Sequence, residues 1–167
     1  MKLLTRIVSL LVLSLALSAC GWQLRGDTAT LNTEGVSVAV VSQVNNPVAA
    51  ALREQLTLSR ALAVEGSETL TIEVGRIRKE KRVVAVDQIG EASVYRITLS
   101  TEVSMTDMNG ETVSAATRMS QSGNYNYDKR ILDAMTEEEL SLDQRLEQQL
   151  AQSIARKATI LGRNLRP

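Results

Sequence analysis

The feature of this sequence that most constrains its fold is a regular alternation of apolar and polar residues between Tyr95 and Met105. A period of two residues is typical of a β-strand that has one face in the core and the other in water. The positions expected to face the core are Tyr95, Ile97, Leu99, Thr101, Val103 and Met105. The segment therefore predicts a sheet strand with a single buried face.

A hairpin turn is predicted directly after this strand. The segment Asp107-Met108-Asn109-Gly110 contains an Asn-Gly pair, which tolerates the positive φ angles of tight turns. The return strand alternates more weakly, and one of its faces is expected to consist of Val113, Ala115, Thr117 and Met119. The two strands and their turn predict antiparallel pairing.

A strand and a helix are predicted near the start of the domain. Residues 36–41 are β-branched and apolar, which favours a buried strand. Asn46 and Pro47 suit the N-cap and the first turn of a helix, which we expect to end near residue 59. Its apolar stripe is formed by Val48, Leu52 and Leu56.

One long strand is expected between this helix and the central hairpin. It begins at Thr69, where the two-residue period starts, and runs on past Ile77 and Arg82. A brief strand at 61–64 is an optional addition before it and does not count toward the sheet.

The C-terminal segment predicts a second helix with one apolar stripe, interrupted by Asp143 and Lys157. Two capping boxes, Thr136 with Glu139 and Ser141 with Gln144, are candidate starts for it. The acidic run 137–139 suits the positive end of the helix dipole. The stripe consists of Leu146, Leu150, Ile154, Ala158, Leu161 and Leu165.

Together these elements predict one α+β domain over residues 36–167. Two helices are expected to pack on a mostly antiparallel four-stranded sheet, which gives a two-layer α/β sandwich. The 148 residues that follow position 19 bury enough surface for one core and not for two.

Residues 1–19 have the features of a secretory signal peptide. Lys2 and Arg6 precede an apolar run of about eleven residues, which is too short to span a bilayer as a helix. The run ends in Leu-Ser-Ala-Cys, which resembles the bacterial lipoprotein cleavage box. We therefore expect Cys20 to be the lipidated first residue of the mature chain and 20–35 to be its tether. An unmodified thiol in a secreted protein is the alternative.

The composition excludes many classes of enzyme. The chain has no histidine and one cysteine, so it lacks the residues for a Ser-His-Asp triad, a histidine-bound metal, an internal disulfide or a cysteine-clustered metal site. No phosphate-binding or nucleophile motif is present. A net charge of zero with four aromatic residues argues against nucleic-acid binding. We expect a protein that is not an enzyme and holds no cofactor.

Two clusters are candidate binding sites. Five basic residues lie close together at Arg76, Arg78, Lys79, Lys81 and Arg82. They suit anionic head groups, since each Lys or Arg adds about 1 kcal/mol near a charged lipid surface; a solvated strand end is the alternative. In a strand, Lys79 and Lys81 would point away from the arginines.

The second cluster contains Tyr125, Tyr127 and Arg130. Tyrosines at a turn suit a protein interface. They equally suit the closed edge of a core.

The string Cys-Gly-Trp-Gln-Leu-Arg-Gly at 20–26 resembles the mature start of the lipopolysaccharide-assembly lipoprotein family, LptE. The order of elements, the Tyr95 strand and the helix that contains 154–157 are similar as well. The resemblance implies an outer-membrane lipoprotein that plugs an LptD β-barrel, supports its assembly and takes part in lipopolysaccharide delivery. It also implies lipopolysaccharide binding, although the turn before Tyr95 reads Asp87-Gln88-Ile89-Gly90 and lacks the basic residue of some members.

Two other functions fit the same sequence features. A lipoprotein pilot for a secretin would share the anchor and the small size, and a periplasmic lipid-binding module would need an apolar cavity. A lipid-anchored hydrolase is a more distant alternative.

Overall fold

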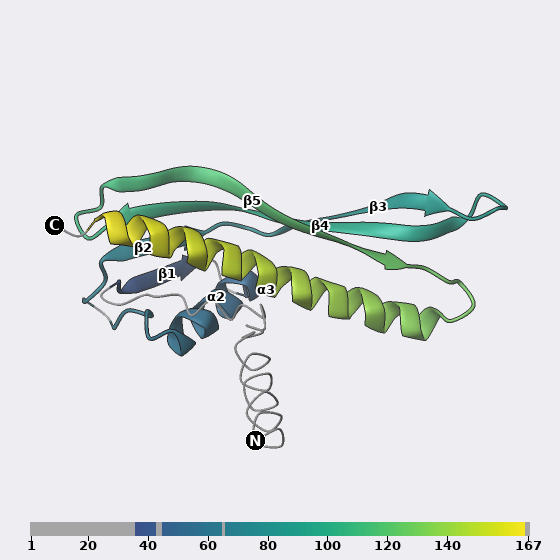
Figure 1. The fold of residues 1–167 in the computed structure, drawn as a ribbon, viewed down its shortest axis with the longest axis horizontal. Coiled ribbons are helices and arrows are strands. Elements are labelled where there is room, and N and C mark those ends of the chain that lie inside the picture. Colours follow the sequence, from purple (N-terminus) through teal and green to yellow (C-terminus); the bar gives the residue numbers. More distant parts are fainter. Residues whose placement is uncertain (1–35, 43–44, 65, 166–167) are drawn as a thin grey trace, which may run out of the picture. The chain divides into compact units, whose positions relative to one another are not determined.

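The computed structural model describes residues 36–42, 45–64 and 66–165. This part of the chain contains β1 (Val38–Ser42), α2 (Pro47–Leu58), β2 (Leu70–Val74), β3 (Arg78–Val86), β4 (Ala92–Asp107), β5 (Thr112–Asn126) and α3 (Leu132–Asn164) (Figure 1). The predicted signal peptide, lipidation site and tether at 1–35 lie outside the described residues.

Strand β4 is the centre of the sheet. One of its edges pairs with β5 along almost the whole strand. The other edge is shared, because β2 pairs with 103–107 of β4 and β3 pairs with 92–100. These three pairings are antiparallel, and β1 extends the sheet by pairing with β2 in parallel. The predicted α+β class is confirmed, with five strands in place of the four expected.

The additional strand arises from a break at Gly75. The chain that starts at Thr69 was predicted as one strand, but the Gly75 carbonyl accepts hydrogen bonds from Asn46 Nδ2 at 2.9 Å and Thr101 Oγ1 at 2.8 Å. These two side chains take the place of a neighbouring strand as the hydrogen-bond partners of the Gly75 carbonyl. The Gly75 N–H still donates to the Glu102 carbonyl at 2.8 Å. As a result, β2 and β3 are consecutive segments along one edge of β4.

Helix α2 has the predicted start and the predicted buried stripe. Asn46 caps it, since its side-chain Oδ1 accepts a hydrogen bond from the Ala49 N–H at 3.0 Å. The buried residues are Val48, Ala49, Leu52 and Leu56. Residues 61–64 form a single bridge between Leu62 and Val38 in place of the brief strand expected there.

Helix α3 begins earlier than predicted. It starts at Leu132 with no side-chain cap at Ile131, so both predicted capping boxes are wrong as helix starts. Thr136 lies inside the helix, where its hydroxyl donates to the Leu132 carbonyl at 3.0 Å. At the other end, Leu165 is the C-cap and is 40% exposed, so it does not belong to the buried stripe.

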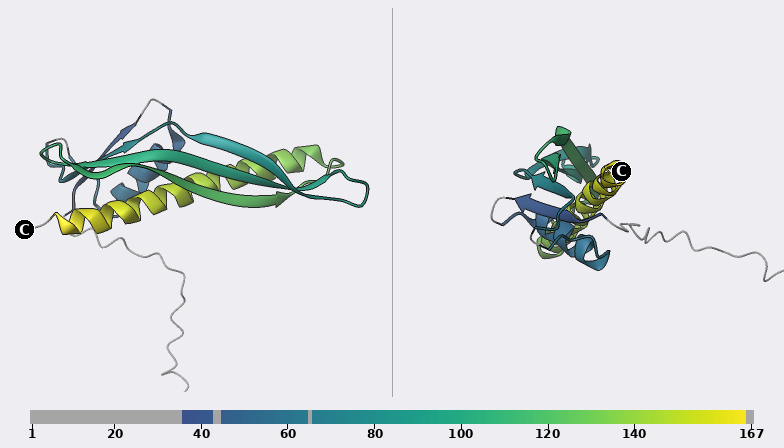
Figure 2. Two further views of the ribbon diagram at one scale, coloured as in Figure 1. Left: turned by 90° about the horizontal axis from the view of Figure 1, so that it is seen from above. Right: turned by 90° about the vertical axis from the view of Figure 1, so that its left-hand side faces the viewer.

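Both helices lie on the same face of the sheet (Figure 2). Buried residues from that face of β4 meet the helices, as the alternation predicted, and Tyr95 is partly buried beside them. At Gly123 of β5, an added Cβ would lie 2.6 Å from Leu142 Cδ1, so α3 and β5 approach closely there.

The predicted hairpin turn between β4 and β5 is also confirmed. Gly110 has φ 79°, and the Asp107 side chain accepts a hydrogen bond from the Glu111 N–H at 2.8 Å.

Candidate functional site

The basic cluster is divided between the two faces of β3. Lys79 and Lys81 reach the helix-covered face, where both contact α3. Arg78 and Arg82 occupy the alternate positions of the strand, and Arg76 is an exposed residue between β2 and β3. The predicted separation of the two lysines from the arginines is confirmed.

Lys79 and Lys81 form an ionic clamp with Glu139 and Asp143 of α3. Lys79 Nζ lies 2.9 Å from Glu139 Oε1 and also pairs with Asp143 Oδ2. Lys81 Nζ pairs with Glu139 Oε2, which in addition accepts a hydrogen bond from the Tyr125 hydroxyl at 2.8 Å. We use the name ionic clamp for the five residues Lys79, Lys81, Tyr125, Glu139 and Asp143. They join α3 to β3 and β5.

Three tyrosines pack beside the clamp. The rings of Tyr95 and Tyr125 stack with centroids 5.7 Å apart, and the Tyr127 ring meets Tyr95 edge-on at 5.2 Å. Lys81 Nζ lies 4.6 Å from the centre of the Tyr95 ring, within the range of a cation–π contact. Tyr125 is only 3% exposed, so its ring offers almost no surface to another protein.

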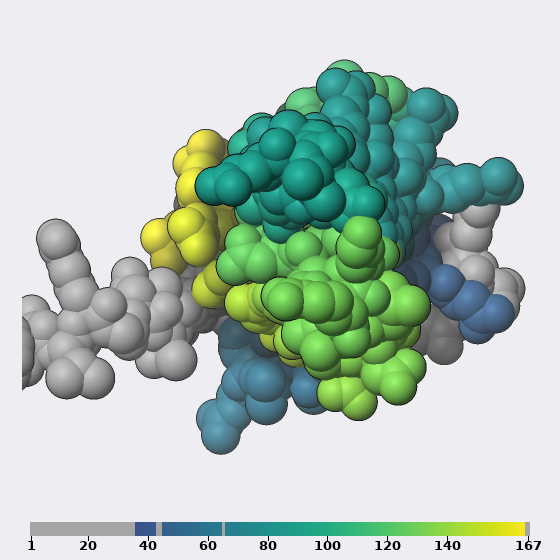
Figure 3. Space-filling model, turned by 90° about the vertical axis from the view of Figure 1, so that its right-hand side faces the viewer, coloured from purple at the N-terminus to yellow at the C-terminus, as the bar shows by residue number. Residues whose placement is uncertain are grey.

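The other two residues of the tyrosine cluster lie near the end of β5. Tyr127 is half-buried, whereas Arg130 is exposed and forms an ion pair with Asp128. Lys129 pairs with Glu91 from the β3–β4 hairpin. Figure 3 shows this end of the domain, where the hairpin lies beside the start of α3.

The clamp holds Glu139, Lys79 and Lys81 in their charged forms. Hydrogen bonds from Lys81, Lys79 and Tyr125 outweigh burial and lower the pKa of Glu139 to about 2. Burial lowers the pKa of Lys79 and Lys81, but their hydrogen bonds to the carboxylates outweigh it and raise both values. Burial raises the pKa of Tyr125. Glu139 and the lysines therefore exchange no protons near neutral pH, as a general acid or base would have to do.

A cleft of about 460 Å³ lies beside the clamp, between α3 and the end of β5. The clamp residues on one wall already neutralise one another, and the rest of the lining is largely apolar or aromatic. The lining residues outside the clamp are Tyr127, Leu132, Met135, Thr136 and Leu140. Within the described ranges, no group of His, Cys, Asp and Glu residues is arranged to hold a metal ion.

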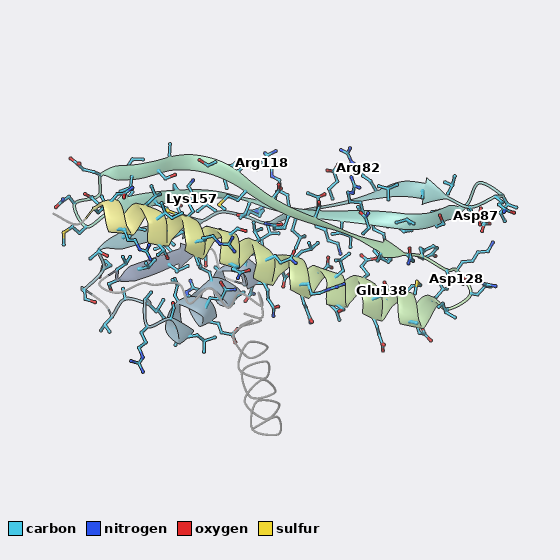
Figure 4. The ribbon with its side chains drawn as sticks, viewed as in Figure 1. Arg82, Asp87, Arg118, Asp128, Glu138 and Lys157 are labelled. Atoms are coloured by element: carbon cyan, nitrogen blue, oxygen red, sulfur yellow. The ribbon has the colours of Figure 1, made fainter. Side chains whose placement is uncertain are left out.

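The opposite face of the sheet is polar and carries the arginines. Arg82 of β3 lies directly opposite Arg96 of β4. Each of these like charges has a local partner, since Arg82 Nε donates to Glu80 at 2.8 Å and Arg96 Nε donates to Asn124 at 3.0 Å. Figure 4 shows Arg82 and Arg118 on the side of the sheet away from α3. Arg76 and Arg78 make no ion pair within the described part of the chain.

Sequence reasoning missed Glu139 and Asp143 as partners of the lysines. Glu139 lies in an acidic run that suits the helix dipole without any partner, and Asp143 interrupts the apolar stripe of α3. That interruption was the available signal, because a carboxylate on a core-facing stripe needs a cation nearby. Cys20, the predicted lipid site, lies outside the described residues. No helix among the residues that the structure describes is long and apolar enough to cross a membrane.

Comparison with solved structures shows the same fold in bacterial lipoproteins. The rare lipoprotein B from Shewanella oneidensis has a TM-score of 0.67 at 17% identity, covering 77% of this chain and 98% of that one. A lipoprotein B from Nitrosomonas europaea has a TM-score of 0.62 at 16% identity, covering 74% and 82%. A minor lipoprotein from Acinetobacter baumannii has a TM-score of 0.59 at 14% identity, covering 75% and 90%.

The sequence comparisons assign the family. No curated protein sequence matches this chain. The family model of LptE, described as lipopolysaccharide-assembly, matches residues 33–158. This match extends from before β1 into the C-terminal half of α3 and covers well over half of the chain. The protein therefore belongs to the LptE lipopolysaccharide-assembly family.

Proposed function

We propose that this protein is a lipid-anchored outer-membrane lipoprotein that plugs an LptD-type β-barrel and supports the assembly of that barrel. In this role it takes part in delivering lipopolysaccharide to the outer leaflet. The observation that carries the proposal is the LptE family match over 33–158, which includes every strand of the sheet and the clamp. The lipoprotein fold of the solved structures agrees with it.

The chemistry of the clamp supports a scaffold more than a catalyst. Its carboxylates and ammonium groups form ion pairs with each other, and these pairs join α3 to the edge of the sheet. A plug needs such internal pairing, because a charge left without a partner is costly when a second protein excludes water from it.

For direct lipopolysaccharide contact, the arginines of the basic cluster are better placed than its lysines. Lys79 and Lys81 are already paired with carboxylates of α3. Arg76 and Arg78 are exposed and make no ion pair in the described part of the chain, and Arg82 is exposed and paired only with Glu80 of its own strand. Guanidinium groups bind phosphate in a bidentate manner, so these three suit the phosphates of lipopolysaccharide. Tyr127 and Arg130 remain candidates for the barrel interface, because both keep solvent-accessible surface.

The test of the central proposal is purification from detergent-solubilised outer membranes with an affinity tag on the C-terminus. We expect a one-to-one complex with a large β-barrel protein. A free monomer would overturn the proposal, and recovery of a secretin would identify a pilot protein. The Cys20→Ser variant is the matched control for the anchor: it should lose acyl labelling, and labelling that persists would contradict Cys20 as the lipid site.

The arginine site has a separate test. Arg78→Glu combined with Arg82→Glu should weaken lipopolysaccharide binding by the purified protein. Arg145→Glu, which reverses one exposed charge on α3, is the control and should leave binding unchanged. Equal binding by all three proteins would show that the arginines are only a solvated strand end.

A further inference from the structure

Helix α3 separates its charges along its length. All six of its acidic residues lie before Gln148, and from Gln148 onward its charged residues are Arg156, Lys157 and Arg163. The helix dipole accounts for Arg163 in the last turn, since its effect falls off within one turn of the helix end. Arg156 and Lys157 lie farther from that end and need another explanation.

These basic residues surround exposed apolar surface. Ile160 is 58% exposed and Leu161 is half-buried beside it. Together with Ser153, Arg156 and Lys157, they line an open hollow of about 330 Å³. Neither Arg156 nor Lys157 forms an ion pair within the ranges that the structure describes. We call Arg156, Lys157, Ile160, Leu161 and Arg163 the basic patch.

The basic patch lies where the N-terminal segment joins the domain. Val36 is the first described residue and is buried against α3. An added Cβ at Gly162 would lie 2.6 Å from Val36 Cγ1, so the chain enters the domain within two residues of Ile160. Val36 is the sixteenth residue after Cys20, so the chain between them reaches at most about 55 Å. A lipid at Cys20 would hold the basic patch within that distance of a membrane.

We propose that the basic patch docks the domain onto an anionic phospholipid surface next to the anchor. The ammonium and guanidinium groups contact lipid phosphates, and Ile160 and Leu161 enter the interface between head groups and acyl chains. This combination of basic and apolar residues on one helix is typical of membrane-surface helices. The inference uses the predicted anchor of the proposed function, and it adds a second contact that orients the domain.

The charges on the basic patch determine which surface it binds. Each Lys or Arg near an anionic membrane strengthens binding about fivefold. Removal of two therefore weakens docking roughly 25-fold, and reversal of their sign weakens it more. A neutral bilayer gains nothing from these charges, so docking should require anionic lipid.

The experiment uses the full lipidated chain with Ile160→Cys, reconstituted into vesicles. Cys20 is the only native cysteine and its sulfur is acylated, so an environment-sensitive fluorophore attaches only to the introduced thiol. Wild-type protein should take no label. We expect a blue-shifted emission and several-fold slower quenching by an aqueous reductant in vesicles of phosphatidylcholine with phosphatidylglycerol, but not in phosphatidylcholine alone.

Two controls isolate the basic patch. A label at exposed Ser120 on β5 should be equally accessible in both vesicles. Arg156→Glu with Lys157→Glu should abolish protection at position 160, whereas Arg118→Glu with Arg145→Glu, an equal change in charge elsewhere, should not. Circular dichroism checks that each variant is folded.

Three results would overturn the proposal: equal labelling behaviour in both vesicles, protection that persists in the Arg156→Glu/Lys157→Glu variant, or protection that appears only after periplasmic protein is added. The last would mean that the patch binds an acidic protein. Barrel recovery is measured in parallel for the wild type and for the Arg156→Glu/Lys157→Glu variant. If the wild type docks onto vesicles but recovers no barrel, the proposed function is wrong and the docking proposal stands. If the wild type recovers the barrel but does not dock, the docking proposal is wrong and the proposed function stands.

Discussion

Helix α3 packs on the sheet along its length, but its two halves are held by different interactions. The C-terminal half buries Leu146, Leu150, Ile154 and Ala158 against the core, each at most 1% exposed. The N-terminal half is held by the ionic clamp, whose charged side chains are 18–38% exposed. Leu142, packed against Gly123, marks the boundary between the halves.

The difference indicates that stability and orientation have separate sources in this domain. Full burial of one leucine or isoleucine contributes about 1.5–3 kcal/mol. A partly exposed ion pair contributes about 0–1 kcal/mol. The C-terminal half should therefore carry most of the free energy of folding, and the N-terminal half should open locally at lower cost.

The largest effect is expected from a charge in the C-terminal half. Leu150→Asp places an unpaired carboxylate at a position that is 0% exposed, which costs several kcal/mol, and the domain should unfold. Circular dichroism and thermal melting measure this. Gln149→Asp, the neighbouring exposed position, is the control and should melt like the wild type. A folded Leu150→Asp protein would mean that the stripe does not form the core.

Elements that depend on neighbouring residues were predictable from the sequence. The alternation from Tyr95 to Met105 requires only a two-residue period, and the Asn46 cap requires only the next three residues. The stripe around Leu150 follows in the same way from helical spacing. These local patterns placed most of the sheet and both helices.

Features that depend on distant residues were not predictable in the same way. The break at Gly75 requires side chains from Asn46 and Thr101, which are 29 and 26 residues away in the chain. The clamp pairs Lys79 with Glu139, 60 residues apart. A single sequence does not show which elements become neighbours. The alternation of β3 therefore predicted that the lysines face away from the arginines, but it did not predict that α3 supplies their partners.

A smaller effect is expected at the boundary. Gly123→Val introduces a Cβ where Leu142 Cδ1 already lies 2.6 Å away, and overpacking of this kind costs about 1–3 kcal/mol. Denaturant unfolding measures the loss. Leu142→Ala in the same chain should restore part of it, because it removes the clashing methyl groups. Ser122→Val, at the exposed position before it, is the control. Additive destabilisation in the double variant would contradict the close contact.

The clamp itself should contribute less to global stability. Glu139→Gln removes the charge that holds two lysines, at a cost of about 1–2 kcal/mol. Hydrogen exchange should accelerate in residues 132–145 and remain unchanged in 146–164. Glu137→Gln, on an exposed face of the same turn, is the control. Faster exchange along the whole of α3 would show that the two halves form a single cooperative unit.

Acid should remove the same contribution without any mutation. The ordinary pKa of Glu139 is 4.5 and the clamp lowers it to about 2, so the carboxylate stabilises the folded state fully above pH 4.5. Between pH 4.5 and 2 the unfolded state binds the proton first, and the contribution falls. The difference in unfolding free energy between wild type and Glu139→Gln should therefore be constant from pH 7 to 5 and shrink from pH 4.5 to 3. A difference that stays constant down to pH 3 would show that Glu139 contributes through packing, and the two halves of α3 would then be held by the same kind of interaction.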